Sequence, residues 1–233
     1  MKLTTLFLLL ASGAAFAATE ENINKTFPAL PGGKLVVHVD FGSIDVSTNS
    51  RGGEVIADVW RNVTRKSKND EELFLRENPV VFQHEGNTIT IRSQSKEKKR
   101  WFSGWRNRIE AKYTIRVPAQ FTAKLDTSGG VTINSVRGKV KGETSGGSIN
   151  VVLLSPVPGD IWLSTSGGGV TVNVPGDAAF NLNAETSGGG VSCELPVTIE
   201  GKKERNELKG AVNGGGPTLR LESSGGGIHV NKL

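Results

Sequence analysis

"ETSGGGVSCELP", residues 185–196, places three glycines in a row between two stretches that alternate apolar and polar residues. The motif returns as "LDTSGGVTI" (125–133), "GETSGGSINV" (142–151), "LSTSGGGVTV" (163–172) and "LESSGGGIHV" (221–230), with a diverged copy "VDFGSIDV" (39–46). The hydroxyl residues that open it are spaced by 17, 21, 21 and 37 positions, at 127, 144, 165, 186 and 223. Such repetition is typical of solenoids, which stack one structural unit on the next.

Within each unit the sequence alternates with a period of two, the periodicity of a β-strand. We expect the apolar residues after the glycines to point inward: Val131, Ile133, Ile149, Val151, Val170, Val172, Val191, Cys193, Ile228 and Val230. The residues between them are expected to point outward: Thr132, Asn150, Thr171, Ser192 and His229. No helical pattern occurs after residue 111, so this part is predicted to be β-structure throughout.

The predicted fold class is all-β, with a repetitive β-solenoid-like domain similar to a right-handed parallel β-helix. A β-sandwich or a meander of hairpins is the alternative, because Gly-rich corners also close hairpins. Here the glycines would supply a positive φ or a close backbone approach, and the hydroxyls would satisfy turn amides. A phosphate-binding loop needs a lysine and a helix after the glycines, and a calcium-binding turn needs an aspartate; these copies have neither.

The chain begins with features of a secretory signal peptide. Met1-Lys2 is followed by the short apolar run "LTTLFLLLASGAAFA", which ends in Ala15-Phe16-Ala17. We therefore predict a signal peptide at 1–17, cleaved between Ala17 and Ala18, and a periplasmic or extracellular location. No cysteine follows the cleavage site, which argues against a lipid anchor, and no transmembrane segment is expected in the mature chain.

The mature chain is predicted to have three continuous parts: a leader (18–33), a β-rich part (34–116) and the Gly-rich repeats (117–233). In the middle part, "EVIADVWRNVT" (54–64) and "IEAKYTIRVP" (109–118) are predicted strands. "NDEELFLREN" (69–78) indicates a short helix or turn capped by Asn69 or Asp70. "VVFQHEGNTITIRS" (80–93) indicates a hairpin that bends at 85–87.

The formal net charge of +5 comes largely from one segment, because residues 92–108 hold seven basic residues and one acid. Within it, "KEKKRWFSGWRNR" (96–108) combines cations with aromatic side chains, a combination suited to anionic lipid, lipopolysaccharide or acidic glycan. The candidate binding residues are Lys98, Lys99, Arg100, Trp101, Trp105, Arg106 and Arg108. The alternative is a solvated loop whose tryptophans pack against the sheet. A basic face for nucleic acid is not indicated.

A row of acidic residues precedes the motifs, at Asp126, Glu143, Glu185 and Glu222, and Ser164 interrupts it. Lys124, Lys141 and Arg220 lie two residues earlier on the same strand face, which favours an exposed ladder of ion pairs. A cation or glycan site is a second interpretation. Catalytic carboxylates are a third, and they would require two close acids in a groove from among Asp126, Glu143, Asp160, Asp177 and Glu185.

No metal or other cofactor is expected, because the three histidines, His38, His84 and His229, are scattered and lack metal-ligand spacing. Cys193 is the single cysteine, so no intramolecular disulfide forms. Its place in "VSCEL" favours a small buried apolar residue over a reactive thiol. No catalytic residue is assigned, and an enzyme is not expected.

The chain resembles an exported bacterial family of β-strand repeats known as candidate adhesins, a domain of unknown function. The resemblance rests on "VDFGSIDV", "EGNTITIRS", "YTIRVPAQFTAKLDTSGGVTI" and the later SGG copies, over about residues 34–233. It implies a repetitive, solenoid-like β fold at the cell envelope, without catalytic residues. We therefore predict a non-enzymatic envelope adhesin or scaffold. The alternatives are a peripheral binder of anionic surfaces through residues 98–108 and a polysaccharide-active solenoid enzyme.

Overall fold

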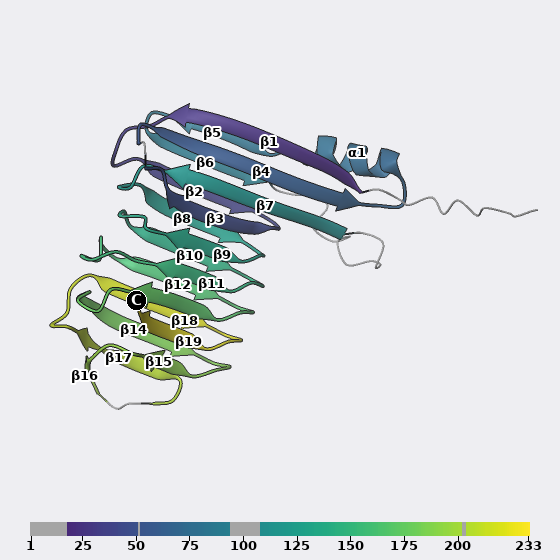
Figure 1. Cartoon of the computed structure of the whole chain (residues 1–233). Helices are drawn as coiled ribbons and strands as arrows, with labels where there is room; N and C mark the ends of the chain where they lie inside the picture. Colours follow the sequence, from purple (N-terminus) through teal and green to yellow (C-terminus); the bar gives the residue numbers. More distant parts are fainter. Residues whose placement is uncertain (1–17, 51, 94–107, 202–203) are drawn as a thin grey trace, which may run out of the picture.

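Two β-sheets stack face to face in the computed structural model (Figure 1), which describes residues 18–50, 52–93, 108–201 and 204–233. Sheet A contains, in spatial order, β1 (Thr19–Pro28), β4 (Glu54–Thr64), β7 (Arg108–Val117), β3 (Ser43–Thr48), β9 (Val131–Asn134), β11 (Ile149–Val152), β13 (Val170–Val174), β19 (Ile228–Lys232) and β15 (Val191–Cys193). Sheet B contains β16 (Val197–Ile199), β17 (Glu207–Val212), β14 (Phe180–Thr186), β18 (Thr218–Ser223), β12 (Ile161–Thr165), β10 (Val140–Thr144), β8 (Thr122–Thr127), β2 (Lys34–Val39), β6 (Thr88–Ser93) and β5 (Val81–Glu85).

Each repeat forms one coil, with a strand in sheet B, a Gly-rich corner and a strand in sheet A. The coils β8–β9, β10–β11 and β12–β13 pair in parallel with the equivalent positions aligned, so that Thr144 lies opposite both Thr127 and Thr165. This confirms the all-β, solenoid-like prediction. Antiparallel strands join at both ends, and the sheets are mixed and not closed, so the more specific right-handed parallel β-helix stays a prediction.

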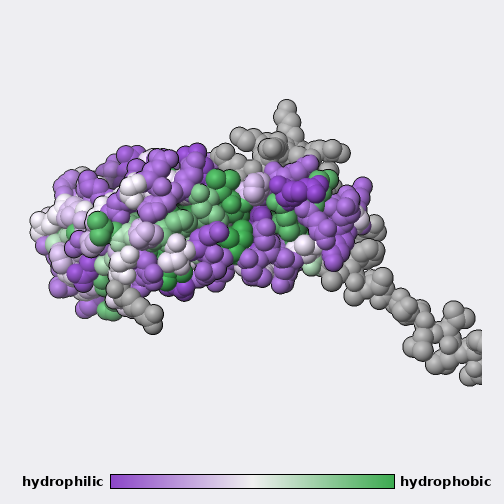
Figure 2. Space-filling view, turned by 90° about the horizontal axis from the view of Figure 1, so that it is seen from above, coloured by the Kyte–Doolittle hydropathy of each residue, from purple (hydrophilic) through white to green (hydrophobic). Residues whose placement is uncertain are grey.

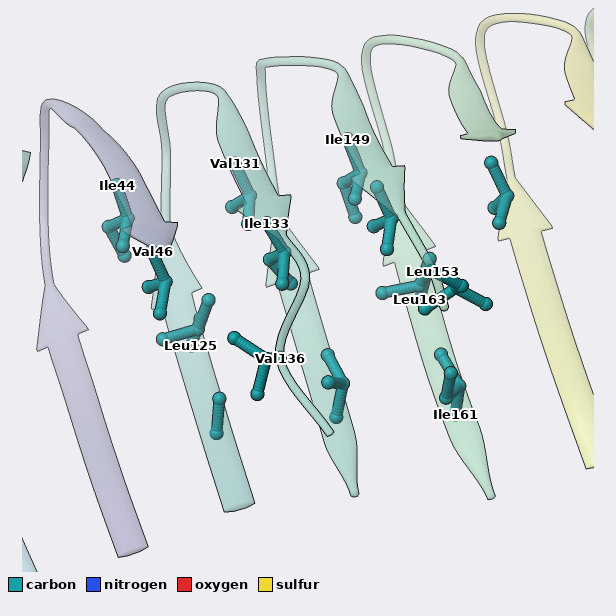
Figure 3. Close-up of a cluster of buried hydrophobic side chains, with 14 of the residues drawn as sticks. Ile44, Val46, Leu125, Val131, Ile133, Val136, Ile149, Leu153, Ile161 and Leu163 are labelled. Atoms are coloured by element: carbon teal, nitrogen blue, oxygen red, sulfur yellow. The ribbon is translucent and has the colours of Figure 1, made fainter. Parts of the chain in front are cut away.

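The alternating residues form the core between the sheets (Figure 3). The predicted inward residues of β9, β11, β13 and β19 are all buried, and they meet Leu125 and Leu163 from sheet B. Val191 and Cys193 point the same way but are only half-buried, because β15 is the edge strand of sheet A. The predicted outward residues are exposed or half-exposed, as the period of two requires.

The buried hydroxyl that opens each motif joins its corner to the neighbouring coil. Thr165 Oγ1 donates a hydrogen bond to the carbonyl of Gly147 at 2.7 Å and accepts one from the amide of Gly168 at 3.2 Å. The same donation to a neighbouring glycine carbonyl occurs at Thr127, Thr144, Thr186 and Ser223. The hydroxyls of Thr127, Thr144 and Ser223, like that of Thr165, also accept a hydrogen bond from an amide of their own turn, as expected.

The corner glycines are required by close packing of backbone on backbone. A Cβ atom on Gly168 would lie 2.5 Å from the carbonyl oxygen of Gly147, and one on Gly226 would lie 2.6 Å from the amide nitrogen of Gly169. Real Cβ atoms essentially never come that close to another heavy atom. Neither glycine has a positive φ. These two glycines are therefore needed for the close approach of neighbouring backbones and not for a left-handed conformation.

The final coil does not follow the order of the sequence. β18 lies between β12 and β14 in sheet B, and β19 lies between β13 and β15 in sheet A. The C-terminus therefore ends within the stack, where the yellow strands of Figure 1 lie among green ones. The long last spacing is an insertion that forms β16 and β17, and these strands extend sheet B beyond β14.

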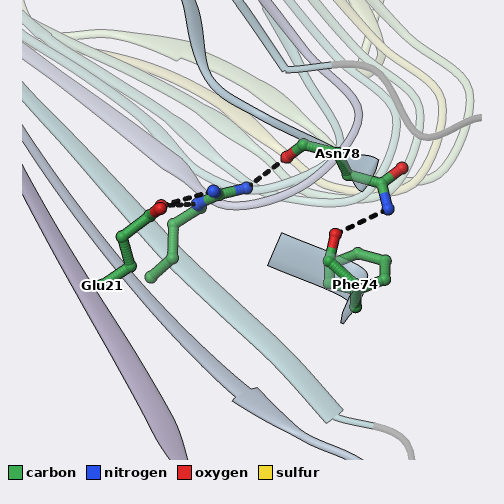
Figure 4. Close-up of polar contacts among 4 residues, drawn as sticks. Glu21, Phe74 and Asn78 are labelled. Atoms are coloured by element: carbon green, nitrogen blue, oxygen red, sulfur yellow. Dashed lines mark hydrogen bonds and ion pairs between the residues drawn. The ribbon is translucent and has the colours of Figure 1, made fainter. Parts of the chain in front are cut away.

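One helix, α1 (Lys68–Glu77), packs against β1 and β4 near the other end. Its N-cap is Ser67, which accepts a hydrogen bond from the amide of Asp70, so the predicted cap at Asn69 or Asp70 was wrong. The buried Arg61 donates to Glu21 and to the carbonyl of Asn78, which ties the end of α1 to β1 (Figure 4). No helix in the described ranges is long and apolar enough to cross a membrane.

The strands around α1 agree with the sequence patterns of the middle part. β5 and β6 form the predicted hairpin, with its turn at Gly86 and Asn87. Residues 18–33, the predicted leader, contain β1, and every residue of β1 pairs with β4. The predicted signal peptide lies outside the described residues, and Ala18 directly precedes β1.

Replacing Gly168 with alanine is expected to lower the free energy of unfolding by about 2–3 kcal/mol, because the new methyl group overlaps the backbone of the next corner. Gly130→Ala is the matched control: its Cβ would meet nothing closer than Ser148 O at 3.6 Å, and the change should stay within about 0.5 kcal/mol. Urea unfolding of both variants measures the difference. Equal stability of the two variants would contradict the role assigned to close approach.

Candidate functional site

Most of the predicted basic site lies outside the described residues: Lys98, Lys99, Arg100, Trp101, Trp105 and Arg106. Arg108 opens β7, is exposed and forms an ion pair with Glu110. The proposal of an anionic-surface site at 98–108 therefore stays a prediction. Among the described residues, a cluster of charged side chains and a groove lie on the outer face of sheet B.

Two rows of side chains cross the strands of that face. The parallel register aligns one row as Lys124, Lys141, Trp162 and Arg220, and the next as Asp126, Glu143, Ser164 and Glu222. Lys141 pairs with Glu143 at 3.3 Å and Arg220 pairs with Glu222 at 2.5 Å, which confirms the predicted ladder at these positions. Asp126 pairs with His38 Nδ1 at 2.7 Å instead of with Lys124.

A groove of about 650 Å³ runs beside the basic row. We call it the basic groove, and define it by Lys34, Lys124, Lys139, Lys141, Trp162 and Arg220. Within the described part of the chain, Lys34, Lys124 and Lys139 have no acidic partner within 4.0 Å, and all three are exposed. Its one lining acid, Asp160, accepts a hydrogen bond from the amide of Thr218. The groove therefore carries an excess of positive charge.

Trp162 stands in the middle of the groove between two cations. Lys141 Nζ lies 3.8 Å from the centroid of its ring, and Arg220 Cζ lies 5.9 Å from it on the neighbouring strand. The indole nitrogen of Trp162 donates to Glu222 at 3.3 Å. These contacts fix the ring and hold Lys141 and Arg220 at the groove, where each is also paired with a glutamate.

The sequence pointed to Lys124, Lys141 and Arg220 as part of the charged ladder, but it did not indicate the groove. Lys34 and Lys139 were missed because they lie outside the repeat motif, at the start of β2 and just before β10. A signal for Trp162 was present, since it occupies the position at which three other copies carry a cation. A break in the repeat therefore marked this site.

The acids considered for catalysis are separated or ion-paired. Asp126 and Glu143 lie opposite each other on adjacent strands, beside a second hollow of about 350 Å³ that is also lined by His38, Arg92 and Lys124. Asp160 and Asp177 lie in the links that precede β12 and β14, and Glu185 lies near the end of β14. Among the described residues no three His, Cys, Asp or Glu side chains are grouped to hold a metal ion.

The fold and the groove define a class of protein: a stacked, β-solenoid-like repeat protein with an open charged face. Residues 120–231 match the family model described as Toastrack DUF4097. This match is to a domain of unknown function in bacterial proteins, and it confirms the resemblance found in the sequence.

The comparison with solved structures gives matches from several bacteria. A candidate cell adhesion protein from Clostridium sporogenes is 15% identical with a TM-score of 0.59, and the match covers 91% of this chain and 100% of that one. A candidate adhesin from Bacteroides fragilis is 11% identical with a TM-score of 0.33, covering 91% and 97%. The first likeness shows a shared fold. No curated protein matches the sequence.

Cys193 is expected to be a slow nucleophile in the folded chain. Burial raises the pKa of its thiol above the ordinary value, so the reactive thiolate is scarce at neutral pH. Alkylation by iodoacetamide, followed by mass spectrometry, should be slower in the folded chain than in urea, and it should accelerate toward alkaline pH. Equal rates in the folded and unfolded chain would contradict this expectation.

Proposed function

We propose that the chain is an exported, non-enzymatic protein of the cell envelope that acts as an adhesin-like scaffold and binds acidic polymers in the basic groove. The observation that carries this proposal is the set of three exposed lysines without acidic partners, Lys34, Lys124 and Lys139, gathered in one groove of the described chain. Export rests on the predicted signal peptide. The adhesion role agrees with the name of the Clostridium sporogenes protein that shares the fold.

The shape of the groove favours an extended ligand. Its cations come from β2, β8, β10 and β18, with β12 and Trp162 between the last two. Adjacent strands lie about 4.8 Å apart, so the charges extend over about 19 Å across the strands. A linear acidic glycan lying along the stack could contact several cations at once, whereas a single small anion would contact few. Several weak, exposed contacts of this kind add up and weaken with salt.

The pairing of the acids supports binding over hydrolysis. A glycosidase of the usual kind uses two carboxyl groups on either side of the bond that it breaks, one of which must act as an acid. Asp126 and Glu143 instead share one face of one sheet, where Asp126 contacts the imidazole of His38 and Glu143 forms an ion pair with Lys141. Their role in this proposal is to balance charge beside the groove.

Charge reversal in the groove tests the proposal. The variant with Lys34→Glu, Lys124→Glu and Lys139→Glu should bind polygalacturonate at least about tenfold more weakly than the wild type, because three attractive contacts become repulsive. Neutral dextran should bind neither protein. Isothermal titration calorimetry at two salt concentrations gives the affinities and their salt dependence.

The matched control carries the same charge change away from the groove, as Lys66→Glu, Lys68→Glu and Lys112→Glu. These lysines are exposed: Lys66 precedes α1, Lys68 is its first residue and Lys112 lies on β7 of sheet A. The control should bind polygalacturonate as the wild type does, apart from a small long-range effect at low salt. Equal loss in both triple variants, or no binding by the wild type, would refute the groove as the site.

A further inference from the structure

The strand β1 forms an unpaired edge of sheet A, at the end of the stack opposite to β15 and β16. In the described residues β1 pairs only with β4, and it forms the border of sheet A. It contains ten residues, whereas the other border strands, β5, β15 and β16, contain five, three and three. A long edge strand presents a row of free amides and carbonyls that can pair with another strand.

The core is also incompletely covered at this end. Val55, Ala57 and Val59 on β4 are buried, but Ile23 and Phe27 on β1 are only half-buried, since the facing strand β5 is half as long. Phe82 on β5 is also half-buried and meets Phe27 with ring centroids 6.1 Å apart, while Val81 on β5 is 45% exposed and Leu30, which follows β1, is 72% exposed. Figure 2, which looks onto this end, shows an apolar strip bordered by hydrophilic residues. Contiguous exposed apolar surface of this kind marks interaction sites.

We propose that this end docks against the same end of a second copy, with the two β1 strands paired antiparallel about a two-fold axis. Such a contact is self-complementary and closes as a dimer. It would join the two A sheets through backbone hydrogen bonds and cover both apolar strips. The proposal is independent of the ligand assigned to the basic groove.

The charges of β1 select the register of this pairing. With Ile23 opposite Ile23 of the second copy, Glu21 lies opposite Lys25 of that copy, and the reverse pair repeats the contact. Glu21, Ile23 and Lys25 share one strand face, so the ion pairs would flank an apolar centre. Arg61 donates to Oε2 of Glu21, which leaves Oε1 for Lys25. Pro28 comes after the last residue of the paired stretch, where its missing amide costs no hydrogen bond.

Sedimentation velocity of the exported chain over a range of concentrations tests the dimer. The wild type should form dimers, and Lys25→Glu should weaken them at least about tenfold, because each Glu21 would then oppose a second acid. Lys112→Glu, with the same charge change on β7, should dimerise as the wild type does. Circular dichroism confirms that the variants are folded.

A cross-link tests the register in a Cys193→Ser background. Ile23→Cys places two thiols at the two-fold axis, where directly opposed residues have the Cα separation that a disulfide needs, and oxidation should yield a covalent dimer. Asn24→Cys, shifted by one residue, should cross-link poorly. A wild type that stays monomeric, or assemblies that grow beyond dimers, would overturn the proposal. So would a dimer that is indifferent to Lys25→Glu and to the position of the thiol.

Discussion

The backbone of each Gly-rich corner packs directly on the backbone of the next, and the rest of the stack depends on this contact. The corners at Gly168 and Gly147 lie so close together that no Cβ atom fits between them. The coils are therefore as close at the corners as hydrogen-bonded strands are in the sheets. The Thr165 hydroxyl then bridges from its own turn to the neighbouring carbonyl. Aligned corners fix the register of both sheets, and the register creates the rows of like positions on each face.

Because the corners are nearly equivalent, corner contacts alone do not specify which coil lies next to which. The insertion of β18–β19 between β12–β13 and β14–β15 illustrates this point, since the hydroxyl bonds between corners are preserved although the sequence order is broken. The contacts that distinguish the final coil lie on the outer faces. Trp162 bonds to Glu222 in sheet B, and Asn173 accepts a hydrogen bond from Asn231 in sheet A. Of these side chains Trp162 breaks the repeat, and it bonds to the coil that is inserted out of sequence order.

Features that depend on neighbouring residues could be predicted from the sequence, and features that depend on distant ones could not. The period of two predicted the buried residues after the corners, such as Val131 and Val172, and the spacing along one strand predicted the ion pair of Lys141. In contrast, β1 has a polar sequence, and its pairing with β4 could not be read from that sequence. The place of the final coil depends on contacts between residues far apart in the sequence, such as Asn173 and Asn231, which are 58 positions apart. The basic groove was missed for the same reason, because Lys34 and Lys139 approach it from separate coils.

The free charge of the groove follows from the arrangement of acids two residues after each cation. Lys141 and Arg220 are each followed by a glutamate at that distance and are paired with it. Two residues after Lys34 comes Val36, and two residues after Lys139 comes Lys141. Neither lysine therefore has an acid at the position that forms the ion pair in the other strands. Lys124 is followed by Asp126, but His38 from β2 binds that carboxylate. His38 therefore holds the carboxylate nearest to Lys124 on its own strand, and Lys124, Lys34 and Lys139 supply the cations of the groove that lack an acidic partner in the described chain.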